Sequence, residues 1–241
     1  MHPERETLDF DIVYVGAGPA NLASALHLKR LLGRNGVHSP EIAVIDKGRY
    51  PGAHLLSGAI LDPRALNEFF PDFMVSGCPI SSEVSRESAM FLTAGKKIPF
   101  PFLPEAFSSK GCLLVSLSRL GAWLAEKAQE AGVQLFDSTA AVAPVMEHGR
   151  LTGVVTDEKG VGRNGSRKSG FEPGIILKAN VFIIGEGSRG SFLPQLSGIF
   201  PSAKDADRGY YSSGLKETWR IPEGRLRAGE IIHLFGYPLP S

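Results

Sequence analysis

Two closely spaced glycines, set between a buried strand and a helix, restrict the folds open to this chain more than any other pattern in it. Residues 10–15 are almost all apolar and include β-branched and aromatic side chains, which is typical of a strand inside a parallel sheet. Gly16 and Gly18 follow, and helical spacing of apolar residues then continues to about residue 32. Such a turn lets backbone N–H groups approach phosphates closely, in front of the positive end of a helix. The pattern therefore predicts a dinucleotide-binding turn.

A second apolar run ends in an acidic residue. Residues 42–45 are Ile-Ala-Val-Ile, and Asp46 follows them, which completes a βαβ unit. In that context the glycine pattern is much stronger evidence than it is alone. A carboxylate at this strand end can accept hydrogen bonds from both hydroxyls of an adenosine ribose. We therefore predict that Asp46, with its neighbour Lys47, contributes to the same binding site.

The third position of the glycine pattern holds Asn21. Glycine at this position lets the helix pack closely on the strand. We expect Asn21 to push the helix outward slightly or to force a local adjustment. The phosphate contacts, which depend on Gly16 and Gly18, should survive, so Asn21 would alter the affinity for the cofactor and not its class.

Another buried strand is followed by a second turn of small residues. Residues 175–184 have strand character and lead into Gly185, Glu186 and Gly187, after which a helix is expected. This turn predicts a second approach of the backbone to the same dinucleotide. Arg189 could add positive charge there, although the sequence does not indicate where its side chain points.

The remaining segments complete an α/β pattern. A helix is predicted over residues 117–132, with Leu120, Trp123, Leu124 and Ala128 on one face, and a short parallel strand over 133–136. Residues 140–156 indicate antiparallel strands with a turn near His148 and Gly149. The polar segment 157–174 is interpreted as a solvated connector. Within the irregular stretch 47–118, short strands are predicted over 88–93 and 97–102.

Composition excludes several classes of protein. Charged residues make up 21% of the chain and the net charge is +1, which gives no electrostatic case for nucleic acid. No apolar run approaches the roughly 20 residues that span a bilayer. Residues 1–7 lack the character of a signal or transit peptide, so we expect the chain to work in a cytosolic or matrix-like compartment. The two cysteines, Cys78 and Cys112, are expected to be reduced thiols.

Five segments resemble one family, the electron transfer flavoprotein–ubiquinone oxidoreductases, in order and spacing over nearly the whole chain. The least generic of them are GAHLLSGAILDPRAL at 52–66 and GVGRNGSRKSGFEPG at 160–174. The others are DIVYVGAGPANLASA at 11–25, VSLSRLGAWLAEKAQEAG at 115–132 and GEGSRGS at 185–191.

The resemblance implies a function for the intact protein. Members of this family take electrons from reduced electron transfer flavoprotein and pass them to membrane ubiquinone, using FAD and a 4Fe-4S cluster. They attach to one membrane face without spanning it, at the bacterial inner membrane on its cytoplasmic side or at the mitochondrial inner membrane. Members are more than twice this length, and their cluster cysteines lie beyond residue 241. The resemblance therefore implies that this chain is an N-terminal fragment that cannot complete the reaction alone.

The expected fold is α/β: a Rossmann-like FAD-binding domain, with a parallel sheet and an antiparallel β-meander, and the start of an α+β quinone or substrate domain. We expect the first domain to comprise residues 1–78 and 112–200, and the second 79–111 and 201–241. The resemblance adds His54, Ser57 and Gly58 as neighbours of the flavin. No catalytic acid–base pair and no metal ligands are predicted. The complete set of expected cofactor-binding residues is Gly16, Gly18, Pro19, Ala20, Asp46, Lys47, His54, Ser57, Gly58, Gly185, Glu186 and Gly187.

Two alternatives stay open. The chain could belong to another FAD-dependent reductase or hydroxylase of the geranylgeranyl-reductase type, which would use a nicotinamide cofactor. It could also be a non-catalytic, truncated FAD-binding module. Rapid reduction of the flavin by NADH or NADPH would favour the first alternative, and a folded chain without affinity for FAD would favour the second.

Overall fold

The computed structural model describes residues 5–36, 38–56, 58–200 and 214–238, and it divides the chain into two compact units. The first unit comprises Met1–Leu55 and Leu120–Gly214, and the second comprises Leu56–Arg119 and Leu215–Ser241. The boundaries expected from the sequence, at residues 78 and 112, both lie inside the second of these units.

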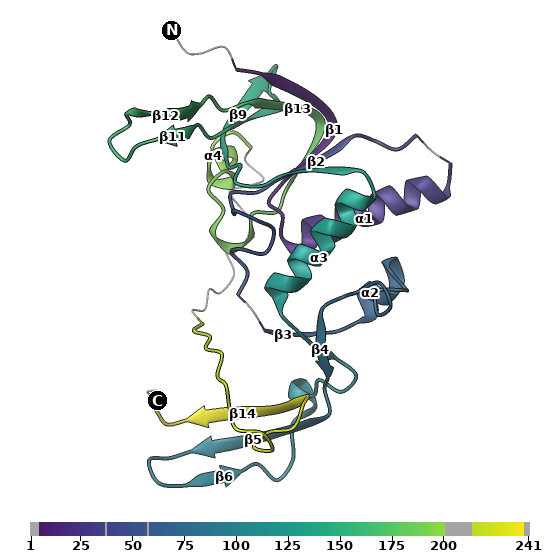
Figure 1. The fold of residues 1–241 in the computed structure, drawn as a ribbon, viewed down its shortest axis with the longest axis vertical. Coiled ribbons are helices and arrows are strands. Elements are labelled where there is room, and N and C mark those ends of the chain that lie inside the picture. The colour runs from purple at the N-terminus through teal and green to yellow at the C-terminus, as the bar shows by residue number, and fades with distance from the viewer. Residues whose placement is uncertain (1–4, 37, 57, 201–213, 239–241) are drawn as a thin grey trace. The chain divides into compact units, whose positions relative to one another are not determined.

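The first unit is built on a six-stranded mixed sheet with the strand order β8-β2-β1-β13-β10-β9. Figure 1 labels β2, β1, β13 and β9 of this sheet. The parallel part consists of β8 (Val133–Phe136), β2 (Ile42–Ile45), β1 (Thr7–Val15) and β13 (Ile176–Ile184). The antiparallel part consists of β10 (Arg150–Thr156) and β9 (Ala141–Glu147). The parallel sheet and the antiparallel strands expected from the sequence are thus confirmed.

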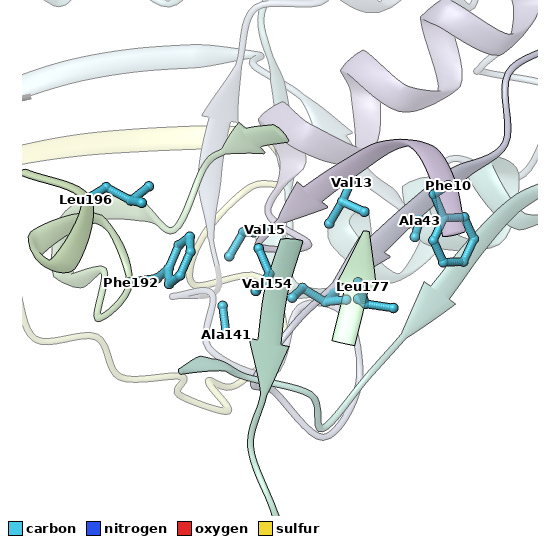
Figure 2. Close-up of a cluster of buried hydrophobic side chains, with 10 residues drawn as sticks. Phe10, Val13, Val15, Ala43, Ala141, Val154, Leu177, Phe192 and Leu196 are labelled. Atoms are coloured by element: carbon cyan, nitrogen blue, oxygen red, sulfur yellow. The ribbon is translucent and has the colours of Figure 1, made fainter. Parts of the chain in front are cut away.

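Burial of the central strands explains their composition. All four residues of β2 are buried, and so are the last three residues of β1. Figure 2 shows Val13 and Val15 of β1 near Val154 of β10 and Leu177 of β13, in one apolar cluster. Nearly continuous apolar runs are the pattern of strands covered on both faces.

Two helices follow the predicted spacing. Helix α1 (Pro19–Arg34) begins directly after the first glycine turn and buries Leu22, Ala25 and Leu26. Helix α3 (Leu117–Glu130) buries one side, as predicted. The buried residues of α3 include the four expected ones, Leu120, Trp123, Leu124 and Ala128.

One prediction for the first unit is wrong. Residues 157–174 are not a plain connector, because β11 (Lys159–Val161) and β12 (Arg167–Glu172) pair as an antiparallel hairpin. Its strands lack apolar alternation, and its shape depends instead on two glycines with positive φ, Gly160 and Gly165. The guanidinium carbon of Arg167 also lies 4.0 Å from the centre of the Phe171 ring, a stabilising cation–π contact. By contrast, the tight turn expected near residue 148 is confirmed, with positive φ at both central residues.

The second unit contains two small three-stranded sheets. One has the order β3-β7-β4, formed by β3 (Ala59–Leu61), β7 (Leu113–Val115) and β4 (Ile80–Glu83). The other has the order β14-β5-β6, formed by β14 (Glu230–Gly236), β5 (Arg86–Leu92) and β6 (Lys97–Pro99). Both strands predicted in this region exist, although β6 is shorter than expected. A short helix, α2 (Arg64–Phe69), and a 3₁₀ turn, η1 (Glu105–Phe107), complete the unit. Over the described part of the chain, no helix combines the length and the apolar character needed to cross a bilayer.

Candidate functional site

The two glycines of the first turn have different surroundings. Gly16 has φ +103°, a conformation that strains any residue with a side chain, and an added Cβ would lie 2.5 Å from the carbonyl oxygen of Gly185. Gly18 has the extended backbone values φ −75° and ψ 166°, and an added Cβ would meet no described atom within 4 Å. The backbone conformation at position 16 and its contact with Gly185 thus require a glycine there, whereas the space beside Gly18 is open.

The N-terminus of α1 is available to an anion. Gly18 occupies the N-cap position and makes no side-chain cap hydrogen bond, and Pro19 starts the helix. The first N–H groups of a helix have no partner within the helix, and the helix dipole makes this end electropositive. A phosphate placed beside Gly18 and Ala20 would therefore meet hydrogen-bond donors and favourable charge.

Asp46 joins the first turn to the end of β2. The N–H of Ala17 donates to Oδ2 of Asp46 (2.7 Å), and the N–H of Gly48 donates to Oδ1 (2.6 Å). An ionised carboxylate has about four lone-pair sites, so each oxygen can still accept a further bond. Asp46 therefore fixes the turn and retains capacity for the hydroxyls of a ribose.

The second glycine turn lies against the first. The N–H of Gly185 donates to the carbonyl of Val15 (2.9 Å), and Gly187 has φ +74°. Glu186 has a role that the sequence did not indicate. Its carboxylate accepts N–H bonds from Ser191 (3.1 Å), Phe192 (2.9 Å) and Leu193 (2.8 Å), at the start of the short helix α4 (Leu193–Ser197). The chain therefore uses this carboxylate internally, which leaves the backbone of residue 186 for a ligand.

The turn is also anchored to the core. A 3₁₀ turn, η2 (Gly187–Arg189), precedes α4, where a regular helix had been expected directly after the glycines. Phe192 is fully buried, and Figure 2 shows its ring on the side of Val15, Val154 and Ala141, with Leu196 beside it. This packing holds the second turn at the end of β13.

A third loop, which sequence reasoning missed, completes the site. After β8, the N–H of Thr139 donates to the carbonyl of Asp46 (2.6 Å), and the N–H of Ser138 donates to the carbonyl of Gly48 (2.7 Å). The loop is in turn held by Lys159 and Asp157, which bond the carbonyl of Ser138 and the N–H of Ala140 respectively. Because β8 lies next to β2, the rule that ligands bind at the carboxyl ends of parallel strands could have pointed to this loop.

These loops surround one cleft of about 810 Å³ within the first unit, in the size range of about 300–1,000 Å³ that small-molecule sites occupy. Residues that sequence reasoning had not selected also line it, among them Leu55, Thr139, Ala140 and Ser188. Ser57 lies outside the described residues, and Gly58 belongs to the second unit. The expected residues that line the cleft are Gly16, Gly18, Pro19, Ala20, Asp46, Lys47, His54, Gly185, Glu186 and Gly187.

Asn21 does not point away from the strand. It is only 5% exposed, and its side-chain amide donates to the carbonyls of Val15 (3.1 Å) and Gly16 (2.7 Å). The sequence predicted either an outward shift of the helix or a local adjustment. The structure has a local adjustment: the missing side chain of Gly185 leaves room for the amide of Asn21.

Comparisons with known proteins agree with this picture. No family model matches the chain. A protein from Pseudomonas aeruginosa named electron transfer flavoprotein-ubiquinone oxidoreductase is 38% identical over 98% of this chain and 44% of its own length. The mitochondrial protein of that name from Dictyostelium discoideum is 37% identical over 98% of this chain and 39% of its own length.

Solved structures share the fold at low identity. A geranylgeranyl bacteriochlorophyll reductase-like protein from Thermoplasma acidophilum has a TM-score of 0.55 and 17% identity, over 79% of this chain and 42% of that one. The flavin-dependent monooxygenase PieE, solved with FAD and substrate, has a TM-score of 0.53 and 21% identity, over 79% and 32%. These neighbours confirm the α/β fold.

The chain thus spans about two-fifths of the length of the curated relatives that it matches. The similarity covers at least 98% of this chain, and the relatives include bacterial and mitochondrial proteins whose names share the term electron transfer flavoprotein-ubiquinone oxidoreductase. The resemblance inferred from the sequence is therefore confirmed: over nearly its whole length the chain is homologous to part of the electron transfer flavoprotein–ubiquinone oxidoreductases.

Proposed function

We propose that this chain binds FAD and forms the flavin-binding part of an oxidoreductase that carries electrons from reduced electron transfer flavoprotein to ubiquinone. The observation that carries the proposal is the meeting of two glycine turns and Asp46 around one cleft. The open space at Gly18, the uncapped start of α1 and the carboxylate at the end of β2 fit the pyrophosphate and ribose of the ADP half. The residues present therefore fit the cofactor.

Each part of the site would do a separate task. Gly18 and Ala20 would offer N–H groups to the phosphates, and Asp46 would accept the ribose hydroxyls. The backbone of Gly187 and Ser188 would lie along the middle of the cofactor, and His54, which is exposed and lines the cleft, would be a polar neighbour of the flavin. When bound, FAD supplies the transfer of electrons, and the protein supplies position and polarity.

The 4Fe-4S cluster implied by the resemblance does not fit this chain. Such a cluster is held by about four thiolates, and the sequence has two cysteines. Burial raises the pKa of the Cys78 thiol to about 11, which disfavours the thiolate that a cluster needs. No group of three potential metal ligands occurs among the described residues. We assign the cluster to residues outside this sequence.

The partners follow from the relatives' names. We propose electron transfer flavoprotein as the donor and ubiquinone as the acceptor, with the intact protein attached peripherally to an inner membrane of a bacterium or a mitochondrion. Much of the quinone site would be formed by parts of the protein beyond this sequence, so we expect no steady quinone reduction by the chain alone.

Calorimetric titration of the purified chain tests the proposal. We expect FAD to bind with a stoichiometry near one, ADP to compete with it, and FMN, which lacks the adenosine and one of the two phosphates, to bind far more weakly. A chain that is folded by circular dichroism but takes up no FAD would overturn the proposal and favour a non-catalytic remnant.

A second function is favoured by the fold neighbours named as a reductase-like protein and a monooxygenase. In that case NADPH would reduce the bound flavin rapidly. Stopped-flow reduction of the FAD-loaded chain by NADPH and by reduced electron transfer flavoprotein, measured side by side, separates the two functions.

A further inference from the structure

Asn21 and Gly185 meet at the ends of two neighbouring strands. Asn21 lies in the first turn of α1, and Gly185 directly follows β13. A Cβ added to Gly185 would lie 2.6 Å from Nδ2 and 2.7 Å from Cγ of Asn21, closer than side chains approach in proteins. The amide of Asn21 therefore occupies the space that a side chain at position 185 would need.

The same amide controls the orientation of one peptide in the turn. In a trans peptide the C=O and the N–H point in opposite directions. The carbonyl of Gly16 accepts the bond from Asn21 (2.7 Å), while the N–H of Ala17, in the same peptide, donates to Asp46 (2.7 Å). The peptide between residues 16 and 17 is thus held at both ends. Both acceptors of the Asn21 amide are carbonyls, so its nitrogen must face them.

We propose that Asn21 and Gly185 form one positioning unit, which holds the peptide between residues 16 and 17 in the orientation that a dinucleotide needs. The unit exists only when the side chain at 21 is an amide and position 185 has none. It lowers the cost of FAD binding because the turn is already ordered before the cofactor arrives. The proposal deepens the proposed function and rests on it for the identity of the ligand.

A double-mutant cycle on thermal or urea unfolding of the FAD-free chain tests the pairing. Gly185→Ala should destabilise strongly because its Cβ collides with Asn21. In Asn21→Gly/Gly185→Ala the collision is gone, so the double variant should be more stable than Gly185→Ala, with a coupling of at least about tenfold in the folding equilibrium. Additive effects of the two substitutions would overturn the pairing.

Affinity for FAD tests the positioning role. Asn21→Asp keeps the size of the side chain but turns an acceptor oxygen toward the two carbonyls, so FAD should bind at least about tenfold more weakly in variants that are still folded. The Asn21→Gly/Gly185→Ala variant should fold but should not regain wild-type affinity, because the amide is missing. If that variant bound FAD with wild-type affinity, the pair would contribute packing only, and the positioning role would be overturned.

The two measurements separate this inference from the proposed function. If the wild-type chain bound no FAD, the proposed function and the positioning role would both fail. The unfolding cycle would still decide, without FAD, whether residues 21 and 185 are coupled.

Discussion

Within each of the two glycine turns of the cleft, the first and the second glycine use their missing side chains in opposite ways. At Gly16 and Gly185 the space beside Cα is filled by the chain itself, by a backbone carbonyl in the first case and by the Asn21 amide in the second. At Gly18 and Gly187, no described atom comes within 4 Å of an added Cβ. The first pair therefore allows the turns to pack together, and the second pair leaves room for a ligand. A glycine pattern in the sequence does not distinguish these two tasks.

The largest loss of stability should follow from adding a side chain to a glycine whose neighbouring space is already filled by the chain itself. Gly16→Ala combines an unfavourable φ of +103° with a collision at the carbonyl of Gly185, so we expect a loss of about 3 kcal/mol or more in unfolding free energy. Urea unfolding measures it. Gly36→Ala is the matched control, since Gly36 also has positive φ (+62°) but open surroundings, and it should cost only about 1 kcal/mol. Equal losses in the two variants would show that strain alone, and not the contact between turns, determines the cost.

The next largest loss of stability should follow from substitution of Glu186. Glu186→Ala removes the acceptor for the N–H groups of residues 191–193, and we expect a loss of about 2 kcal/mol in unfolding free energy. Glu186→Gln keeps the size and one acceptor oxygen, and should lose about half as much. The affinity for FAD should change little in both variants, provided that they are folded. A large loss of affinity with unchanged stability would mean that the carboxylate contacts the cofactor.

Substitution of Asp46 should lower both the unfolding free energy and the affinity for FAD. In Asp46→Asn one oxygen becomes an NH₂ group, so one of the two N–H groups that Asp46 accepts, from Ala17 or Gly48, loses its partner. We expect a loss of about 1 kcal/mol in unfolding free energy and about tenfold weaker FAD binding. Titration of FAD and ADP into the same variant checks the assignment, because both ligands carry the ribose and should weaken equally. Loss of FAD affinity without loss of ADP affinity would contradict a role at the ribose.

Local patterns in the sequence were enough to predict the parts of the site that depend on neighbouring residues. The strand–turn–helix at Gly16 and Gly18, the strand that ends at Asp46 and the buried face of α3 are all encoded within a few residues. The second turn, at Gly185, could be predicted from the same kind of local pattern, because a buried strand leads into it.

The parts that were missed depend on residues far apart in the sequence. Thr139 joins the site because β8 pairs with β2, and the orientation of Asn21 depends on the absence of a side chain at Gly185. The β11–β12 hairpin has no apolar alternation to predict it, and its shape depends on backbone conformations of glycine. Glu186 faces inward only because the chain folds back to present the N–H groups of residues 191–193 to it.

The most direct test of the central claim is FAD affinity after Gly18→Ala, measured beside unfolding free energy. The backbone at Gly18 suits any residue and its surroundings are open, so the loss of stability should stay within about 1 kcal/mol, the cost of alanine at an N-cap position. FAD should bind at least about tenfold more weakly, because the methyl group would stand where the phosphates approach. Gly33→Ala, which also adds a methyl group in open space but at the far end of α1, should leave FAD affinity unchanged. If Gly18→Ala bound FAD as tightly as the wild type, the phosphates would not lie on this turn and the account of the site would be wrong.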